Sequence, residues 1–455
     1  MNIDKDFNLE DPIFALATPW GRSALAVIRL SGKELFSYLT TALPGRISLR
    51  DIPPRQITRR HMIDPSTGEV IDELMLALYK EPHSYTGQDM LELYCHGGIP
   101  TILRIFSLLR SLGLRDAQGG EFSLRAFVNG KLDLSQAEAV NELISAQSDK
   151  ARQLALRRLH GGLSQVVNNI KERLINLLCE VEVQLDYPDE SDEHINIDPN
   201  AFIQILNQID QLLGSYRAGK IYQEGAVVAV AGRPNAGKST LFNLLLKEER
   251  AIVSTIPGTT RDFLDGFVSI KGIPIHLYDT AGLRDSAEEI EIEGIRRTHK
   301  LLEHADLIIY VVDAQTGLKA EDKAFISERL KNKSIICLWN KIDLSSSQVP
   351  ADFIPFSAQT AYGLAELEER LYNLLVGNSH LVGESLAIDS ELQKEALEKA
   401  RHALMAAWEL FQSRASYDLL ASELQQTIHE LGYITGEVSS SEVLARVFSR
   451  FCVGK

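Results

Sequence analysis

The segment AVVAVAGRPNAGKSTLFNLL combines two glycines, a lysine and a serine at a spacing suited to phosphate binding. Gly232, Gly237, Lys238 and Ser239 follow the pattern G-x-x-x-x-G-K-S, between an apolar run typical of a buried strand and a run typical of a helix. Backbone N–H groups at a helix N-terminus can surround phosphates, Lys238 can neutralise the β and γ phosphates, and Ser239 can ligate Mg²⁺. The pattern therefore predicts a nucleoside triphosphate site.

Three later segments supply groups for the other sides of such a site. In IHLYDTAG, Asp279 ends an apolar run and can hold the water shell of Mg²⁺, while the N–H of Gly282 can contact the γ-phosphate. In ICLWNKID, Asp343 can accept two hydrogen bonds from the N1–H and 2-amino groups of guanine, an edge that adenine lacks. IPFSAQ supplies Ser357 and Ala358 beside the base. Together these segments predict a GTPase domain.

The segments resemble the Ras-like GTPase superfamily over about residues 225–378, with two departures. Ser-Ala-Gln stands where Ser-Ala-Lys is commoner. Leu283 stands where many members have a glutamine that orients water, and a leucine cannot polarise water. Catalysis then needs another group, and four acids follow in the same segment: Glu288, Glu289, Glu291 and Glu293. A solvated helix start is the alternative interpretation of these acids.

The composition sets limits on the class of protein. The chain has 455 residues and a net charge of -15, which argues against a protein that coats nucleic acid non-specifically, because such binding needs a basic surface. Its four cysteines are far apart and predict neither a zinc site nor a disulfide framework. The acidic start does not resemble a signal peptide, and no apolar run reaches the ~18 residues of a membrane span. We expect a cytoplasmic protein without stable membrane association.

The pattern of hydrophobic residues divides the chain into four parts. Strand-like and helix-like runs alternate over residues 1–129, which predicts an α+β domain. Helical patterns fill 130–221, where Ser135 and Glu138 have the spacing of a capping box, and 381–455, where Leu397, Leu404 and Phe411 recur on one helix face. The predicted GTPase domain, 222–380, separates them. We therefore expect a multidomain chain in which a helical bundle, split in sequence, contains an inserted α/β domain.

GRPNAGKS, STIPGTTRD, DTAGLRD and the terminal FCVGK together resemble the MnmE (TrmE) family of tRNA-modifying GTPases, along the whole chain. The resemblance implies an N-terminal domain for tetrahydrofolate binding and dimerisation, a split helical domain and an inserted Ras-like G domain with a P-loop. It also implies a homodimer whose G domains pair, with GTP hydrolysis that depends on K⁺.

The resemblance assigns residues to each site. Glu291 matches the acid that positions the attacking water. The K⁺ ligands are Asn235, Ser254, Ile256 and Thr259, and the Mg²⁺ ligands are Ser239 and Thr260. The folate contacts are Arg29, Glu92, Lys131 and Lys455. The GTP contacts are Asn235, Ala236, Gly237, Lys238, Ser239, Thr240, Ser254, Thr255, Ile256, Pro257, Gly258, Thr259, Thr260, Asp279, Thr280, Ala281, Gly282, Asn340, Lys341, Asp343, Ser357, Ala358 and Gln359.

The resemblance further implies a reaction. The complex would add an aminomethyl or carboxymethylaminomethyl group to C5 of the wobble uridine, position 34, of certain tRNAs. A 5-formyl- or 5,10-methylene-tetrahydrofolate would supply the carbon. A flavoprotein subunit, MnmG (GidA), would form a heterotetramer with the homodimer and supply FAD and use NADH. The chain has no G-x-G-x-x-G fingerprint, which agrees with redox chemistry in a partner.

Several alternatives stay open at this point. An Era-like ribosome-assembly GTPase or regulatory switch is the main one, although helices rather than a KH module follow the predicted G domain. A lipid anchor at Cys452 is disfavoured because Lys455 does not complete a prenylation box, and the thiol could equally be buried or functional. A basic cluster is a candidate for tRNA contact or a solvated helix face. It consists of Lys150, Arg152, Arg157, Arg158 and His160.

Overall fold

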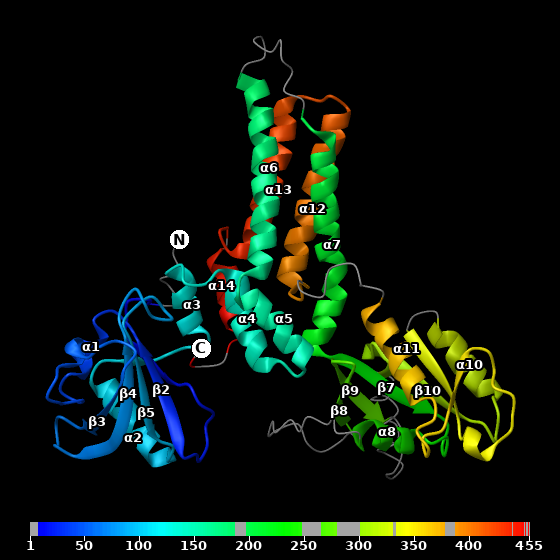
Figure 1. The fold of residues 1–455 in the computed structure, drawn as a ribbon, viewed down its shortest axis with the longest axis horizontal. Helices are drawn as coiled ribbons and strands as arrows, with labels where there is room; N and C mark the ends of the chain where they lie inside the picture. The colour runs from blue at the N-terminus through cyan, green and yellow to red at the C-terminus, as the bar shows by residue number, and fades with distance from the viewer. Residues whose placement is uncertain are drawn as a thin grey trace. The chain divides into compact units, whose positions relative to one another are not determined.

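The computed structural model describes residues 8–186, 197–247, 265–279, 301–330, 334–377, 387–438, 440–449, 451 and 454. The chain divides into two compact units (Figure 1). The first comprises Met1–Asn141, Leu159–Asn168 and His429–Lys455, and the second comprises Glu142–Arg158 and Asn169–Ile428. Among the described residues, none of the helices has the length and apolar character needed to cross a membrane.

The first unit is built on a six-stranded sheet of order β3-β4-β5-β2-β1-β6. β1 and β6 pair in parallel and the other neighbours are antiparallel. Residues of two helices, α1 (Leu35–Leu39) and α2 (Ile99–Ser111), share a buried cluster with one face of the sheet. The strands are β1 (Ile13–Leu16), β2 (Leu25–Ser31), β3 (Ile57–Ile63), β4 (Val70–Tyr79), β5 (Met90–His96) and β6 (Arg115–Asp116).

The C-terminal helix of the chain packs against this N-terminal domain. α14 (Ser441–Phe448) lies beside α3 (Glu121–Val128), and the ring of Phe448 is 6.3 Å from that of Phe127. Gly120 has a φ of 71°, and a Cβ there would lie 2.5 Å from the carbonyl oxygen of Phe448. Only glycine suits both the backbone angle and this close approach. The two ends of the chain therefore build one unit.

The helix α4 (Leu134–Ser145) begins with a reciprocal cap, but not the one that the sequence suggested. The N–H of Gln136 donates to the Asp133 carboxylate at 2.8 Å, and the N–H of Asp133 donates to Gln136 Oε1 at 3.0 Å. Ser135 is buried inside the helix. The predicted pair, Ser135 with Glu138, was therefore wrong by two residues, because an equally good acceptor and amide stand just upstream.

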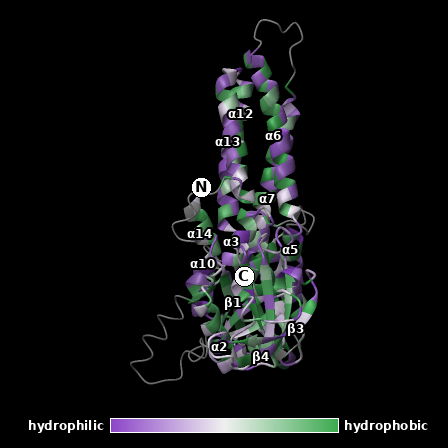
Figure 2. Cartoon of the chain, turned by 90° about the vertical axis from the view of Figure 1, so that its left-hand side faces the viewer, coloured by the Kyte–Doolittle hydropathy of each residue, from purple (hydrophilic) through white to green (hydrophobic). Residues whose placement is uncertain are grey.

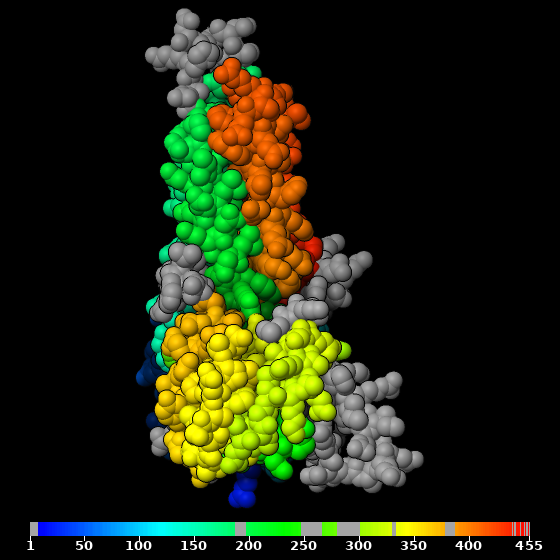
Figure 3. All heavy atoms as spheres, turned by 90° about the vertical axis from the view of Figure 1, so that its right-hand side faces the viewer, coloured from blue at the N-terminus to red at the C-terminus, as the bar shows by residue number. Residues whose placement is uncertain are grey.

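The helical part of the second unit has residues from both sides of the G domain in sequence, as predicted. α7 (Pro199–Glu224) and α12 (Glu391–Gln412) pack along each other, as Figure 3 shows in green and orange. Leu397 and Leu404 of the predicted stripe are fully buried, and the ring of Phe411 is 5.3 Å from that of Phe202. Three further helices are α5 (Asp149–Leu159), α6 (Gly162–Asp186) and α13 (Tyr417–Thr435), and a boundary between the two units falls within each of them. In Figure 2 the long helices alternate purple and green, as amphipathic helices do.

A buried ion cluster joins three separate segments of this unit. The guanidinium of Arg158, whose side chain is 3% exposed, pairs with Glu142 of α4 and with Asp389, which precedes α12. Nη2 of Arg158 lies 2.6 Å from Asp389 Oδ2. Removing one partner from a buried pair costs several kcal/mol, about 3–5, because a charge is left uncompensated. Arg158 is thus part of the interior and not of a solvated basic face.

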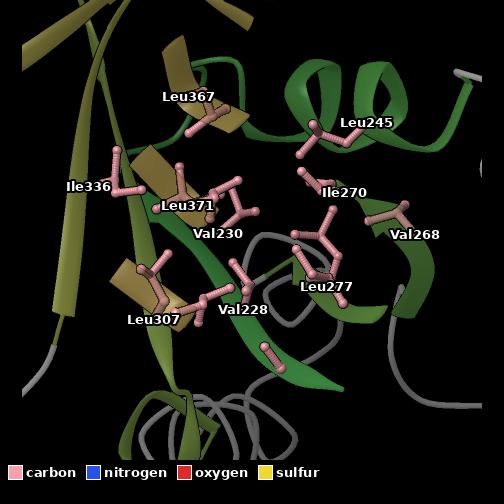
Figure 4. Close-up of a cluster of buried hydrophobic side chains, with 14 of the residues drawn as sticks. Val228, Val230, Leu245, Val268, Ile270, Leu277, Leu307, Ile336, Leu367 and Leu371 are labelled. Atoms are coloured by element: carbon pink, nitrogen blue, oxygen red, sulfur yellow. The ribbon is translucent and has the colours of Figure 1, made fainter. Parts of the chain in front are cut away.

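The G domain is a second six-stranded sheet, of order β12-β11-β10-β7-β9-β8. Its strands are parallel except β8. One face packs under α8 (Lys238–Lys247) and α11 (Leu364–Val376), where Val228, Leu371 and the side chains around them form a dense cluster (Figure 4). α10 (Ala320–Leu330) contributes to the cluster on the other face. The strands are β7 (Ala226–Gly232), β8 (Asp265–Ile270), β9 (Ile273–Asp279), β10 (Leu307–Asp313), β11 (Ser334–Asn340) and β12 (Phe353–Phe356).

Candidate functional site

The phosphate-binding loop connects β7 to α8, as the sequence predicted. Lys238, only 6% exposed, donates from Nζ to the carbonyl oxygens of Gly232 at 3.0 Å and Arg233 at 2.8 Å. The loop backbone therefore binds the ammonium group of Lys238 through two carbonyl oxygens. A cationic group held at the start of a helix provides the charge that a triphosphate needs.

Ser239 and Asp279 meet beside this loop. The hydroxyl of Ser239 donates to Asp279 Oδ2 at 3.0 Å, although the two residues come from α8 and from the end of β9. Asp279 is 3% exposed. Hydroxyl and carboxylate oxygens are the donors that Mg²⁺ prefers, so this pair fits the predicted metal position.

Asn340 connects the phosphate loop to the loop on the base side. Its Nδ2 donates to the carbonyl oxygen of Ala236 at 2.8 Å, and its Oδ1 accepts from the N–H of Ala358 at 3.0 Å. Gly237, with a φ of 99°, permits this bridge, because a Cβ there would lie 2.2 Å from Asn340 Nδ2. Asn340 is thus a buried structural link between the two loops, and Asp343 is exposed nearby on the 3₁₀ turn Ile342–Leu344.

The described part of the chain includes a little over half of the predicted nucleotide contacts. Asn235 in the phosphate loop, Thr240 in the first turn of α8 and Gln359 in the base-side loop are exposed, while Ser357 and Ala358 are buried. Ser357 accepts from the N–H of Thr360 through its hydroxyl at 3.3 Å. The predicted residues outside the described part are Ser254, Thr255, Ile256, Pro257, Gly258, Thr259, Thr260, Thr280, Ala281, Gly282 and Glu291.

A second polar cluster occupies the N-terminal domain. Arg29 of β2 and Glu92 of β5 stand opposite each other in register, and Nε and Nη2 of Arg29 donate to Glu92 Oε1 at 3.1 and 2.9 Å. Nη1 of Arg29 also donates to the carbonyl oxygen of Gly454 at 3.2 Å. Two of the predicted folate residues are therefore in contact, and the C-terminal tail reaches the same guanidinium.

Tyrosines that the sequence reasoning missed support this cluster. Tyr94 donates from its hydroxyl to Glu92 Oε2 at 2.8 Å. Burial and the neighbouring Glu92 carboxylate raise the pKa of Tyr94 to about 12, so the hydroxyl stays protonated, as a donor to Glu92, to a higher pH than an ordinary tyrosine. The guanidinium of Arg29 lies over the ring of Tyr85, 5.8 Å from its centroid. The spacing Glu92-x-Tyr94 on one strand face was the signal that could have identified Tyr94.

Other predicted residues of this domain have different surroundings. Lys131 is exposed just after α3, and none of the hydrogen bonds described for Arg29 involves it. Lys455 and Cys452 lie outside the described residues. In the basic cluster, Arg152 is exposed and pairs with Asp149, while Arg158 is buried in the ion cluster. Arg158 is therefore excluded as a surface contact for tRNA, because its guanidinium is already enclosed.

Comparison with known proteins covers the whole chain. Family models match the MnmE helical domain over residues 134–452 and the N-terminus of the GTP-binding protein TrmE over residues 12–131. The tRNA modification GTPase MnmE of Carboxydothermus hydrogenoformans is 38% identical over 98% of this chain and all of its own length. The protein of the same name from Streptococcus pyogenes is 38% identical over the full length of both.

Solved structures also show similarity to part of the chain. Aquifex aeolicus Era is 28% identical, with 40% of this chain and 67% of that chain covered and a TM-score of 0.27. The G domain of the T. maritima FeoB iron transporter is 29% identical, with 33% and 98% covered and a TM-score of 0.25.

The phosphate loop, the Ser239–Asp279 pair and the Asn340 bridge define a P-loop GTPase, an enzyme that hydrolyses GTP. The additional N-terminal and helical domains specify the family. The chain belongs to the MnmE family of tRNA modification GTPases. This match along the full chain decides against an Era-like switch, the main alternative from the sequence.

Proposed function

We propose that this chain is the GTP-hydrolysing subunit of a complex that adds an aminomethyl or carboxymethylaminomethyl group to C5 of the wobble uridine, position 34, of certain tRNAs. A tetrahydrofolate one-carbon unit supplies the carbon, as 5-formyl- or 5,10-methylene-tetrahydrofolate. The protein acts in the cytoplasm as a homodimer together with MnmG, which carries FAD and uses NADH. Its four parts are 1–129, 130–221, 222–380 and 381–455. The single observation that carries the proposal is the contact of Arg29 with both Glu92 and Gly454.

This contact has a chemical rationale. A carboxylate can pair with the amino-pyrimidinone edge of a pterin, and Glu92 is oriented for such a role because both of its oxygens are already directed by Arg29 and Tyr94. Cations suit the glutamate tail of a folate, a role for Lys131 and Lys455. Of the C-terminal residues that the structure describes, Gly454 accepts from Arg29 through its carbonyl oxygen. The residues present therefore fit a reduced folate.

Exchange of Glu92 for glutamine is expected to weaken 5-formyltetrahydrofolate binding by roughly 10–100-fold, because a hydrogen bond to a charged group contributes about 1.5–3 kcal/mol. Isothermal titration calorimetry on the full-length protein measures this. Glu73→Gln is the matched control, since Glu73 is an exposed carboxylate on β4 of the same sheet and pairs with Arg59. Equal affinities of wild type and Glu92→Gln would remove Glu92 from the site.

In the G domain, different residues have different roles in GTP hydrolysis. Lys238 and the loop N–H groups would hold the phosphates, Ser239 and Thr260 would hold Mg²⁺, and Asp279 would accept hydrogen bonds from water bound to the metal. When bound, K⁺ would supply positive charge where other GTPases use an arginine finger, beside the Mg²⁺ that both kinds of GTPase need. Asn235, Ser254, Ile256 and Thr259 hold K⁺. Glu291 positions the attacking water, and pairing of two G domains encloses the site.

GTP hydrolysis is expected to be roughly tenfold or more faster in KCl than in NaCl at matched ionic strength, with the difference lost in Asn235→Gly. Glycine is the right replacement because Asn235 has a φ of 62°, which alanine would adopt only with strain. The carbonyl that accepts from Lys341 is kept. Initial rates of phosphate release give the answer, with GDP affinity as the control for folding. Equal rates in both salts would eliminate the potassium site.

A further inference from the structure

Asp313 lies at the carboxyl end of β10, next to the nucleotide site, and both of its carboxylate oxygens are engaged. Oδ1 accepts from the N–H of Gln315 at 2.8 Å, and Oδ2 accepts from Nζ of Lys341 at 2.6 Å. The Asp313 side chain is 11% exposed and that of Lys341 is 28% exposed. This is a partly buried ion pair in which the carboxylate has a fixed orientation.

The backbone and side chain of Lys341 are both held in a constrained position, which an ion pair with Asp313 stabilises. Lys341 follows the last residue of β11 with a φ of 67°, a backbone conformation that costs a non-glycine residue energy and persists only when its surroundings enforce it. Its Nζ also donates to the carbonyl oxygen of Asn235 at 2.8 Å. The ammonium thus joins the base-side loop, which carries Asp343, to the phosphate loop. The carboxylate of Asp313 keeps the ammonium at that position.

We propose that Asp313 is a positioning residue for guanine recognition: it holds the Lys341 ammonium against the Asn235 carbonyl and so fixes the loop that presents Asp343 to the base. The inference concerns nucleotide binding alone and is independent of the folate and potassium proposals. In this proposal Asp313 acts through Lys341 and not by its own contact with the nucleotide. Loss of the Asp313 carboxylate is therefore expected to change nucleotide affinity and base selectivity more than it changes kcat.

The informative substitution is Asp313→Asn. An asparagine can still accept from the N–H of Gln315 through its carbonyl, which preserves the local turn, but its NH₂ group cannot accept from the Lys341 ammonium. Binding of fluorescent GDP and IDP analogues to the full-length protein is the measurement. IDP lacks the 2-amino group, so the ratio of the two affinities reports how well Asp343 is placed.

We expect Asp313→Asn to weaken GDP binding about tenfold, to lower the GDP/IDP affinity ratio, and to leave kcat at saturating GTP within about threefold. Lys341→Ala is expected to weaken GDP binding as well. The double variant is expected to bind GDP no more weakly than Lys341→Ala alone, because each single change already removes the same Asp313–Lys341 ion pair. Asp313→Glu keeps the charge and is expected to bind GDP with intermediate affinity.

Asp306→Asn is the matched control. Asp306 precedes the other end of β10 and accepts from the N–H of Val227 at 2.8 Å, so it tests the same chemical change on the same strand away from the nucleotide. Its GDP affinity and GDP/IDP ratio are expected to equal the wild-type values. Losses that multiply in the Asp313/Lys341 double variant, or an unchanged ratio in Asp313→Asn and Asp313→Glu, would overturn the proposal.

Discussion

Replacement of Asp343 by asparagine is expected to lower the affinity for GTP by roughly 10²–10⁴-fold and to raise the affinity for xanthosine triphosphate. The carboxylate can accept from both the N1–H and the 2-amino group of guanine, and each hydrogen bond to a charged group is worth about 1.5–3 kcal/mol. An asparagine presents an NH₂ group to the 2-amino group, so donor faces donor. Xanthine has a carbonyl at that position and restores the pair.

Competition between GTP and xanthosine triphosphate in a hydrolysis assay checks this expectation. Asp352→Asn is a suitable control, because Asp352 is likewise exposed and precedes β12 of the same sheet. An Asp343→Asn variant that still prefers GTP would show that another group reads the base. The effect is expected to exceed that of Asp313→Asn, since the proposal gives Asp343 a direct contact with the base and has Asp313 act through Lys341.

Loss of Lys238 should abolish most of the activity. We expect Lys238→Ala to lower kcat/KM for GTP hydrolysis by roughly 10³-fold or more, because positive charge at the β and γ phosphates stabilises the transition state in a water-excluded site. The ammonium is already fixed by two loop carbonyls and is nearly inaccessible to solvent. It therefore needs little reorganisation when a nucleotide binds.

Steady-state kinetics with thermal denaturation of the same samples provides the measurement. The GDP/IDP affinity ratio of Lys238→Ala should stay at its wild-type value, because the base-side loop is intact. This separates Lys238 from Asp313, whose substitution should change that ratio. A variant that retains more than about a tenth of the activity would contradict the assigned role.

The nucleotide site could be predicted from sequence because its parts are local. The P-loop residues are adjacent in the chain, and the strands that carry Asp279 and Asn340 are apolar runs whose carboxyl ends meet in a parallel sheet. Asp313 was missed because its significance depends on Lys341, 28 residues away, and no local pattern marks the pair.

The polar cluster of the N-terminal domain was even harder to predict from local sequence patterns, because its residues are also distant in sequence. Arg29 and Glu92 were predicted only through resemblance to a family, since nothing local indicates that β2 pairs with β5 in this register. Tyr94 follows from that pairing once it is known. The capping pair at α4 was wrong because two candidate caps stood two residues apart. The role of Arg158 was misjudged because burial depends on Glu142 and Asp389 together.

The ion cluster of Arg158 also has a consequence for biosynthesis. Its partner Asp389 is 231 residues further along the chain, beyond the entire G domain. At a synthesis rate of about 5–20 residues per second, Asp389 is made roughly 10–50 s after Arg158. The G domain is thus fully synthesised while the helical part of the chain is still incomplete. The interval is longer for Arg29, because its partner Gly454 is made 425 residues later. The chain of the nucleotide-binding domain is therefore complete on the ribosome before the helical residues that pair with Arg158 have been made.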